Sequence, residues 1–76
     1  MNYKTYDIVL ASYLQVSDFI MTDIELHGTK GIFVFDNVDA ATLRKYDLNQ
    51  CTVEPQAFNN ALRQLATTVR RMQANV

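Results

Sequence analysis

The sequence is poor in residues that mark several classes of protein: it has one cysteine, one proline, two glycines and no tryptophan in 76 residues. The single cysteine, Cys51, excludes an internal disulfide framework and a four-cysteine zinc site. Uninterrupted apolar runs, such as residues 32–35, reach only four residues and are far too short to cross a membrane. Asp7 interrupts the pattern of a signal peptide. We therefore expect a cytoplasmic protein, in a bacterial cell or in a host cell.

Motifs for catalysis are also missing from the sequence. It has no glycine-rich phosphate loop, no paired-carboxylate motif and no metal-ligand spacing. His27 is the only histidine and lies at a turn signal, where an exposed turn residue is the simpler interpretation than a catalytic base. Cys51 has no second cysteine or histidine near it in sequence and is expected to be a small buried apolar residue. We expect no enzyme, no cofactor and no metal.

Length and composition favour one small folded domain over residues 1–76, with 49% apolar and 20% charged residues. The net charge is only −1, but the charges are unevenly distributed. Residues 1–55 hold all eight acidic and four basic residues, a net charge of −4, whereas residues 56–76 hold three arginines and no acid, a net charge of +3. This asymmetry either marks a charged surface that a partner binds or only complements the helix dipoles.

The N-terminal half of the sequence predicts a helix followed by a β-hairpin. Residues 5–16 have helical periodicity, with Thr5 as the expected cap. The apolar residues that share one face of this helix are Leu10, Ala11 and Leu14, and the tyrosines that could extend it are Tyr3, Tyr6 and Tyr13. Residues 19–27 then alternate, residues 27–31 form a glycine-containing turn, and residues 32–35 are β-branched and aromatic.

The C-terminal half predicts two helices. Residues 36–50 begin with turn residues and continue as a short helix, which Asn37 could cap. A long helix is expected from Pro55 to about Met72, because proline at a helix start loses no hydrogen bond. The fold class is therefore α+β with the order α-β-β-α-α, an antiparallel hairpin covered by helices. Because two strands alone are marginally stable, a second subunit could also extend the sheet.

The last helix carries an apolar seam with heptad-like spacing of four and three. The members of this seam are Phe58, Leu62, Leu65, Val69, Met72 and Val76. The seam is expected to form part of the core, and homodimerisation is the main alternative because the seam continues to the end of the chain.

Basic residues give the sequence its candidate contacts to nucleic acid or to an acidic partner. These candidates are Lys30, Arg44, Lys45, Arg63, Arg70 and Arg71. The three arginines line one stripe of the last helix, where solubility and the helix dipole already explain them and phosphate contact is the functional alternative. Phe33 and Phe35 follow Lys30 and could stack on bases, although a strand of this kind more often belongs to a core.

Three segments carry a resemblance to an uncharacterised family of small domains from bacteria, bacteriophages and mobile elements. They are residues 7–14 with the pattern D-x-x-L-A-x-x-L, residues 32–35, and residues 58–65 with the pattern F-x-x-A-x-R-x-L. The sequence departs from that family at residues 16–19, where family members often have a glycine and a basic residue, and at Ala66 or Thr67, where they often have a lysine. The resemblance covers nearly the whole chain and implies a small accessory protein in a bacterium or a phage-infected host. It brings no catalytic residues.

The sequence as a whole predicts a non-enzymatic interaction module that binds a protein partner and self-associates. A small nucleic-acid-binding protein that uses the arginines of the last helix is the alternative from another class. A third alternative is an inhibitor of a host nucleic-acid enzyme or defence complex. It would present acidic residues as a phosphate mimic, namely Asp18, Asp23, Glu25 and Asp36.

Overall fold

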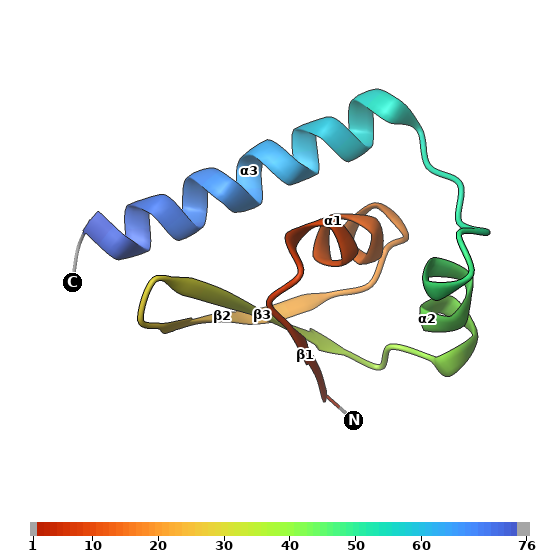
Figure 1. Ribbon diagram of the computed structural model, residues 1–76, viewed down its shortest axis with the longest axis horizontal. Coiled ribbons are helices and arrows are strands. Elements are labelled where there is room, and N and C mark those ends of the chain that lie inside the picture. The colour runs from red at the N-terminus through yellow and green to blue at the C-terminus, as the bar shows by residue number, and fades with distance from the viewer. Residues whose placement is uncertain (1, 75–76) are drawn as a thin grey trace.

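The fold is a three-stranded antiparallel sheet with helices packed against it (Figure 1). The computed structural model describes residues 2–74. Its elements are β1 (Asn2–Thr5), α1 (Ile8–Val16), β2 (Met21–His27), β3 (Lys30–Asp36), α2 (Ala40–Asp47) and α3 (Pro55–Ala74). The α+β class and the helix-covered hairpin expected from the sequence are confirmed.

The central strand of the sheet is β3, because the strand order is β1-β3-β2. Strand β2 pairs with β3 as the predicted hairpin, and His27 lies opposite Lys30 next to the turn. Strand β1 pairs along the other side of β3 and ends with Thr5 opposite Phe33. A bulge interrupts the β2 ladder between Met21 and Asp23, while β3 itself runs without interruption.

The expected order lacked strand β1, and the third strand comes from the same chain rather than from a second subunit. Thr5 ends this strand and does not cap the first helix. Asp7 is the cap: its Oδ1 accepts hydrogen bonds from the backbone N–H of Val9 and Leu10 at 3.0 and 3.3 Å. Thr5 supports the cap indirectly, because its hydroxyl oxygen accepts the N–H of Asp7 at 3.0 Å.

The core lies between the sheet and helices α1 and α3. Phe33 and Phe35 point into it from β3, and both are at most 2% exposed, so the prediction that they are core residues is confirmed. Leu14 of α1 and Leu65 of α3 pack against them. Helix α3 passes over α1 and then continues to the hairpin (Figure 1). This overhang of α3 creates the groove described below.

Helix α2 lies beside this core with none of its residues buried. Its cap is Asp39, whose side chain accepts the N–H of Thr42 at 2.7 Å, and not Asn37 as expected. Asn37 takes a positive φ of 56° in the turn before the helix, a conformation that asparagine tolerates better than most residues. A side-chain hydrogen bond from Thr42, followed by the capping bond from its backbone N–H, lowers the pKa of Asp39.

A hydrogen bond ties α2 to the start of α1. The Tyr46 hydroxyl donates to Oδ2 of Asp7 at 3.0 Å, and its ring stacks on Tyr13 with the ring centres 6.0 Å apart. Burial, followed by the hydrogen bond to Asp7, raises the pKa of Tyr46 to about 12. Since the folded state favours the neutral phenol, this interaction contributes stability below about pH 10, and the contribution is lost as the pH rises toward 12.

We expect the absorbance of phenolate at 295 nm to show this shift directly. The titration curve of the protein minus that of Tyr46→Phe should have a midpoint at about pH 12. Asp7→Asn should move this midpoint toward the value of about 10 for free tyrosine, because it removes the nearest negative charge. Asp47→Asn is the matched control: it removes a charge that makes no hydrogen bond to Tyr46 and should have a smaller effect. A midpoint near 10 in the unmutated protein would contradict this assignment.

Candidate functional site

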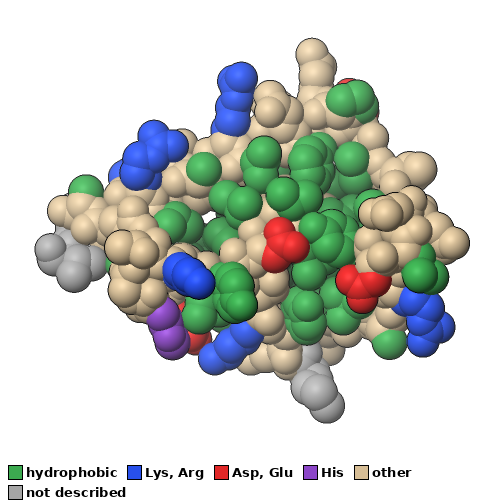
Figure 2. All heavy atoms as spheres, viewed as in Figure 1, with side chains coloured by type: hydrophobic (Ala, Val, Ile, Leu, Met, Phe, Trp, Pro, Cys, Tyr) green, Lys and Arg blue, Asp and Glu red, His purple; other side chains and the backbone are tan. Residues whose placement is uncertain are grey.

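The candidate site is an open groove between the C-terminal half of α3 and the start of α1, which we call the α3 groove. It has a volume of about 270 Å³. Its lining residues are Tyr6, Ile8, Gly31, Phe33, Ala66, Val69, Arg70 and Gln73. Figure 2 shows apolar side chains gathered on this side of the molecule, with Lys and Arg side chains along the outer edge of α3. The groove therefore combines an apolar floor with a basic rim.

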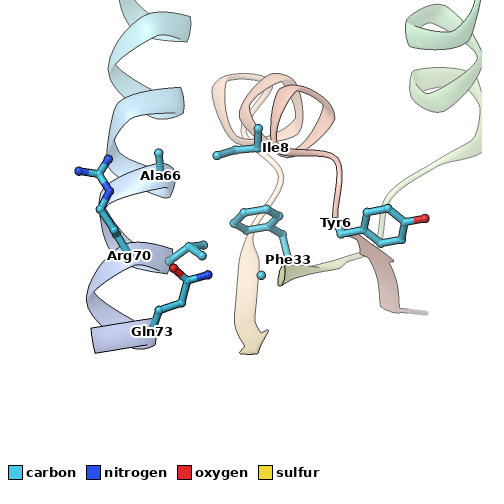
Figure 3. A pocket seen from close by; sticks show the side chains of 8 residues that line it. Tyr6, Ile8, Phe33, Ala66, Arg70 and Gln73 are labelled. Atoms are coloured by element: carbon cyan, nitrogen blue, oxygen red, sulfur yellow. The ribbon is translucent and has the colours of Figure 1, made fainter. Parts of the chain in front are cut away.

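The floor of the groove depends on a close approach of α3 to β3. Gly31 lies so close to Val69 that a Cβ atom built on Gly31 would be 2.6 Å from Cγ2 of Val69. Gln73, one turn further along α3, donates a side-chain hydrogen bond to the carbonyl oxygen of Thr29 at the tip of the hairpin. In Figure 3, Ile8 and Phe33 line the groove between α3 on one side and Tyr6 on the other.

The groove lies where the sheet loses one of its strands. Strand β1 ends at Thr5, opposite Phe33, whereas β3 begins three residues earlier, at Lys30. Residues 30–32 of β3 therefore have a neighbouring strand only on the β2 side. Gly31 belongs to this part of β3; it is buried and lines the groove.

Two cations lie beside the groove. The Nζ atom of Lys30 lies 4.9 Å from the ring centre of Tyr6, a cation–π geometry. Arg70 lines the opposite side, and in Figure 3 its guanidinium lies on the outer side of α3 and points away from Ile8 and Phe33. None of the lining residues is acidic, and within residues 2–74 neither Lys30 nor Arg70 forms an ion pair. Lys30 therefore offers a positive charge at the Tyr6 side of the groove, and the charge of Arg70 lies on the outer side of α3.

The six basic candidates do not form a single patch. Arg44 and Lys45 lie on α2, at the end of the molecule remote from the C-terminal half of α3 (Figure 1). Arg63 and Arg71 are exposed on α3 but do not line the α3 groove. Arg71 borders a second hollow of about 300 Å³, together with Thr67, Arg70 and Ala74. Of the six candidates, the structure brings Lys30 and Arg70 to the α3 groove.

The apolar seam packs against the domain's own core over its described part. Leu65 is buried, Phe58 and Val69 pack against the core cluster, and Leu62 and Met72 are half-buried. Val76 lies outside the described residues. The seam therefore serves as core at Phe58, Leu65 and Val69.

The surroundings of the titratable candidates do not resemble a catalytic centre. His27 is exposed, and its Nε2 lies 3.3 Å from Oε1 of Glu25. The other carboxylate oxygen of Glu25, Oε2, accepts a hydrogen bond from Lys4 at 3.1 Å. The bond from Lys4 is the main cause that lowers the pKa of Glu25. Among the acids considered as a phosphate mimic, Glu25 is thus already paired. Cys51 is half-buried against the core. In the described chain, no three His, Cys, Asp or Glu side chains lie close enough together to hold a metal ion.

The sequence did not point to the groove, because its key residues carry weak signals. Tyr6 was expected to extend the apolar face of the first helix, but it precedes α1 and is 68% exposed. Gly31 was interpreted only as a turn residue, although it belongs to β3 and allows the close approach of α3. A glycine directly before a buried strand was the one available signal for that approach.

Comparisons of the chain with models of protein families, with curated proteins and with solved structures find no match. The resemblance to a family of small domains from bacteria and bacteriophages stays a prediction. Within residues 2–74, no helix is both long enough and apolar enough to cross a membrane.

Proposed function

We propose that this protein is a non-enzymatic binding module whose α3 groove accepts an acidic segment of a protein partner. The observation that carries the proposal is the combination of an apolar groove with Lys30 and Arg70 beside it and no acidic lining residue. An apolar side chain of the partner would lie over Phe33 and Val69, and acidic side chains that flank it would meet Lys30 on one side of the groove and Arg70 on the other. Such a pattern of an apolar anchor and a complementary charge is typical of peptide recognition.

A small nucleic-acid-binding protein is the second candidate, and the arginines of α3 favour it. Arg63, Arg70 and Arg71 are all exposed, and none forms an ion pair within residues 2–74. Contacts to phosphate would make binding fall steeply with salt and would depend on all three arginines. The peptide proposal requires Arg70 far more than Arg63. This difference separates the two candidates in a single experiment.

The test selects ligands for the protein from a phage-displayed library of random 12-residue peptides. We expect enriched sequences to combine Asp or Glu with an apolar residue. Binding of a selected, fluorescently labelled peptide should weaken about tenfold or more for Arg70→Glu, since charge reversal leaves a carboxylate facing a carboxylate. Arg63→Glu is the matched control, an equal charge change on the same helix outside the groove, and should alter binding about twofold at most.

Two results would overturn the peptide proposal. One is the failure of the library to yield any enriched sequence. The other is an equal loss of peptide binding in Arg63→Glu and Arg70→Glu. A single-stranded 20-mer DNA, measured in parallel at low and high salt, provides the comparison. Salt-sensitive binding of this DNA with equal losses in both variants would favour the nucleic-acid candidate.

Self-association of the module also remains a proposal, and the unliganded protein tests it. The chain has a mass of 8.7 kDa, so light scattering at high concentration distinguishes a monomer from a dimer of twice that mass. Phe58, Leu65 and Val69 of the seam already pack in the domain's own core, so a dimer would have to use other residues. An apolar candidate is the region of Tyr6 and Val9, which are both exposed. A monomer at every concentration would remove self-association from the proposed function.

A further inference from the structure

We infer that a second copy of this chain fills the α3 groove by inserting the exposed side chain of Ile20, which is flanked by two acidic residues. This inference rests on the proposed function, because it names an acidic partner for the same groove. We call the group of Asp18, Ile20 and Asp36 the Ile20 knob. The knob has the composition that the groove requires of a partner, namely an apolar side chain with acidic side chains beside it.

Ile20 is unusually accessible for an apolar residue. It is 71% exposed, more than any other large apolar side chain within residues 2–74. It lies between α1 and β2, directly after Phe19, which packs against the core and holds the segment in place. Insertion of this side chain into a groove of another copy would remove its apolar surface from water, which is a favourable change.

Two carboxylates lie beside Ile20. Asp36 donates its backbone N–H to the carbonyl oxygen of Ile20 at 3.0 Å, which continues the register in which Met21 pairs with Phe35. Opposite residues of an antiparallel pair have their side chains on the same face, with Cβ atoms about 4.5–5.5 Å apart. Asp18 is exposed two residues before Ile20. Within residues 2–74, neither Asp18 nor Asp36 forms an ion pair, so both are available to a cation.

The groove matches the knob in size and in charge. A cavity of about 150 Å³ can hold a benzene molecule. The groove has a volume of about 270 Å³ and therefore has room for one isoleucine side chain over Phe33 and Val69. No acidic residue lines the groove, and Lys30 and Arg70 lie on its two sides. Each carboxylate of the knob would thus meet a cation, and opposite charges across a contact favour the correct partner.

The groove and the knob lie at opposite ends of the sheet. Strand β3 begins at Lys30, beside the groove, and ends at Asp36, beside Ile20; a strand of this length spans roughly 20 Å. In Figure 1, the hairpin tip lies beside the C-terminal end of α3, and the other end of β3 leads to α2. One copy therefore cannot fill its own groove. Contact between copies is head to tail, and repetition of such a contact produces open chains unless a ring closes.

The contact is small, so self-association is expected to be weak. One apolar side chain and two charge pairs bury far less than the roughly 1,600 Å² of a standard protein interface. We expect a dissociation constant on the order of 1 mM. The average mass measured by light scattering should therefore be 8.7 kDa in dilute solution and about double at a protein concentration of about 1 mM.

Variants at the two ends separate the knob from the groove. Ile20→Lys removes the knob and keeps the groove, whereas Arg70→Glu keeps the knob and reverses a charge beside the groove. Each variant alone should stay close to the monomer mass at about 1 mM. Leu48→Lys and Arg63→Glu are the matched controls, since Leu48 is 56% exposed elsewhere and Arg63 lies on α3 outside the groove. Both controls should associate as the unmutated protein does.

A mixture of the two variants tests the head-to-tail contact directly. Ile20→Lys labelled with nitrogen-15 has an intact groove, so unlabelled Arg70→Glu should insert its own knob there. The amide NMR signals of Ala66, Val69 and Gln73 in the labelled protein should then shift. Unlabelled Ile20→Lys has no knob and should produce no shift at the same concentration.

Three results would overturn the inference. A selected peptide that binds while the protein stays a monomer at every concentration would overturn the inference alone. Self-association that Leu48→Lys or Arg63→Glu weakens as much as Ile20→Lys does would also overturn it, because the contact would then lie elsewhere. If the library yields no peptide and the mixture produces no shift in the groove, the proposed function fails and the inference fails with it.

Discussion

Phe35→Ala is expected to lower the free energy of unfolding by about 3–5 kcal/mol, the cost of removing a large buried aromatic ring. The Phe35 side chain is 0% exposed near the C-terminal end of the middle strand, where it contacts the core formed by α1 and α3. A domain of 76 residues has a total stability of roughly 4–11 kcal/mol. The substitution therefore removes a large part of the stability, and a sizeable fraction of the molecules should be unfolded at 37 °C.

Urea unfolding followed by far-UV circular dichroism measures this effect. Ile20→Ala is the matched control, because Ile20 is also a large apolar residue near the sheet but is 71% exposed. Its truncation should change the free energy of unfolding by about 0.5 kcal/mol or less. A cost below about 1 kcal/mol for Phe35→Ala would contradict the placement of β3 in the middle of the sheet.

The second large effect is expected from Gly31→Ala, which should destabilise the protein by about 1–3 kcal/mol through overpacking. The new methyl group would lie 2.6 Å from Cγ2 of Val69. Valine cannot easily turn away, since its branched side chain has one strongly preferred rotamer in a helix. The C-terminal half of α3 must therefore move away from the hairpin, and this movement should also widen the groove.

A double-mutant cycle distinguishes this clash from other effects of the substitution. Val69→Ala should relieve most of the cost of Gly31→Ala, so the two changes together should be less destabilising than the sum of the single changes. Gly28→Ala is the control: Gly28 has a φ of +65° and no atom within 4 Å of its potential Cβ. The Gly28→Ala protein should be destabilised by about 1–2 kcal/mol of backbone strain, and Val69→Ala should not relieve this strain. Additive effects of Gly31→Ala and Val69→Ala would contradict the close approach of α3 to β3.

The sequence predicted the elements whose patterns are long or whose turns are marked by glycine. The β2–β3 hairpin is one such element, since residues 32–35 have high β-propensity and follow a glycine-containing turn. Helix α3 is another, because its apolar residues keep helical spacing over several turns. Both were placed within a few residues of their observed bounds.

Short elements and the groove could not be predicted, for a physical reason. Strand β1 has only four residues, too few for alternation to stand out, and it is stabilised by its pairing with distant residues of β3. The groove depends on the place where β1 ends relative to β3 and on the overhang of α3. These relations are set by tertiary packing and leave little trace in local periodicity.

The pairing of β1 with β3 also has a consequence for the order of folding. Asn2 pairs with Asp36, so this ladder must close a loop of more than thirty residues, whereas β2 and β3 are joined by a tight turn. The hairpin and the local helices should therefore form early, and β1 should join late. Until it does, the whole outer side of β3 is exposed to other chains. During synthesis the ribosome releases β1 before β3 exists. The β1 segment therefore stays unpaired until β3 has been made, and only then can the native sheet be completed.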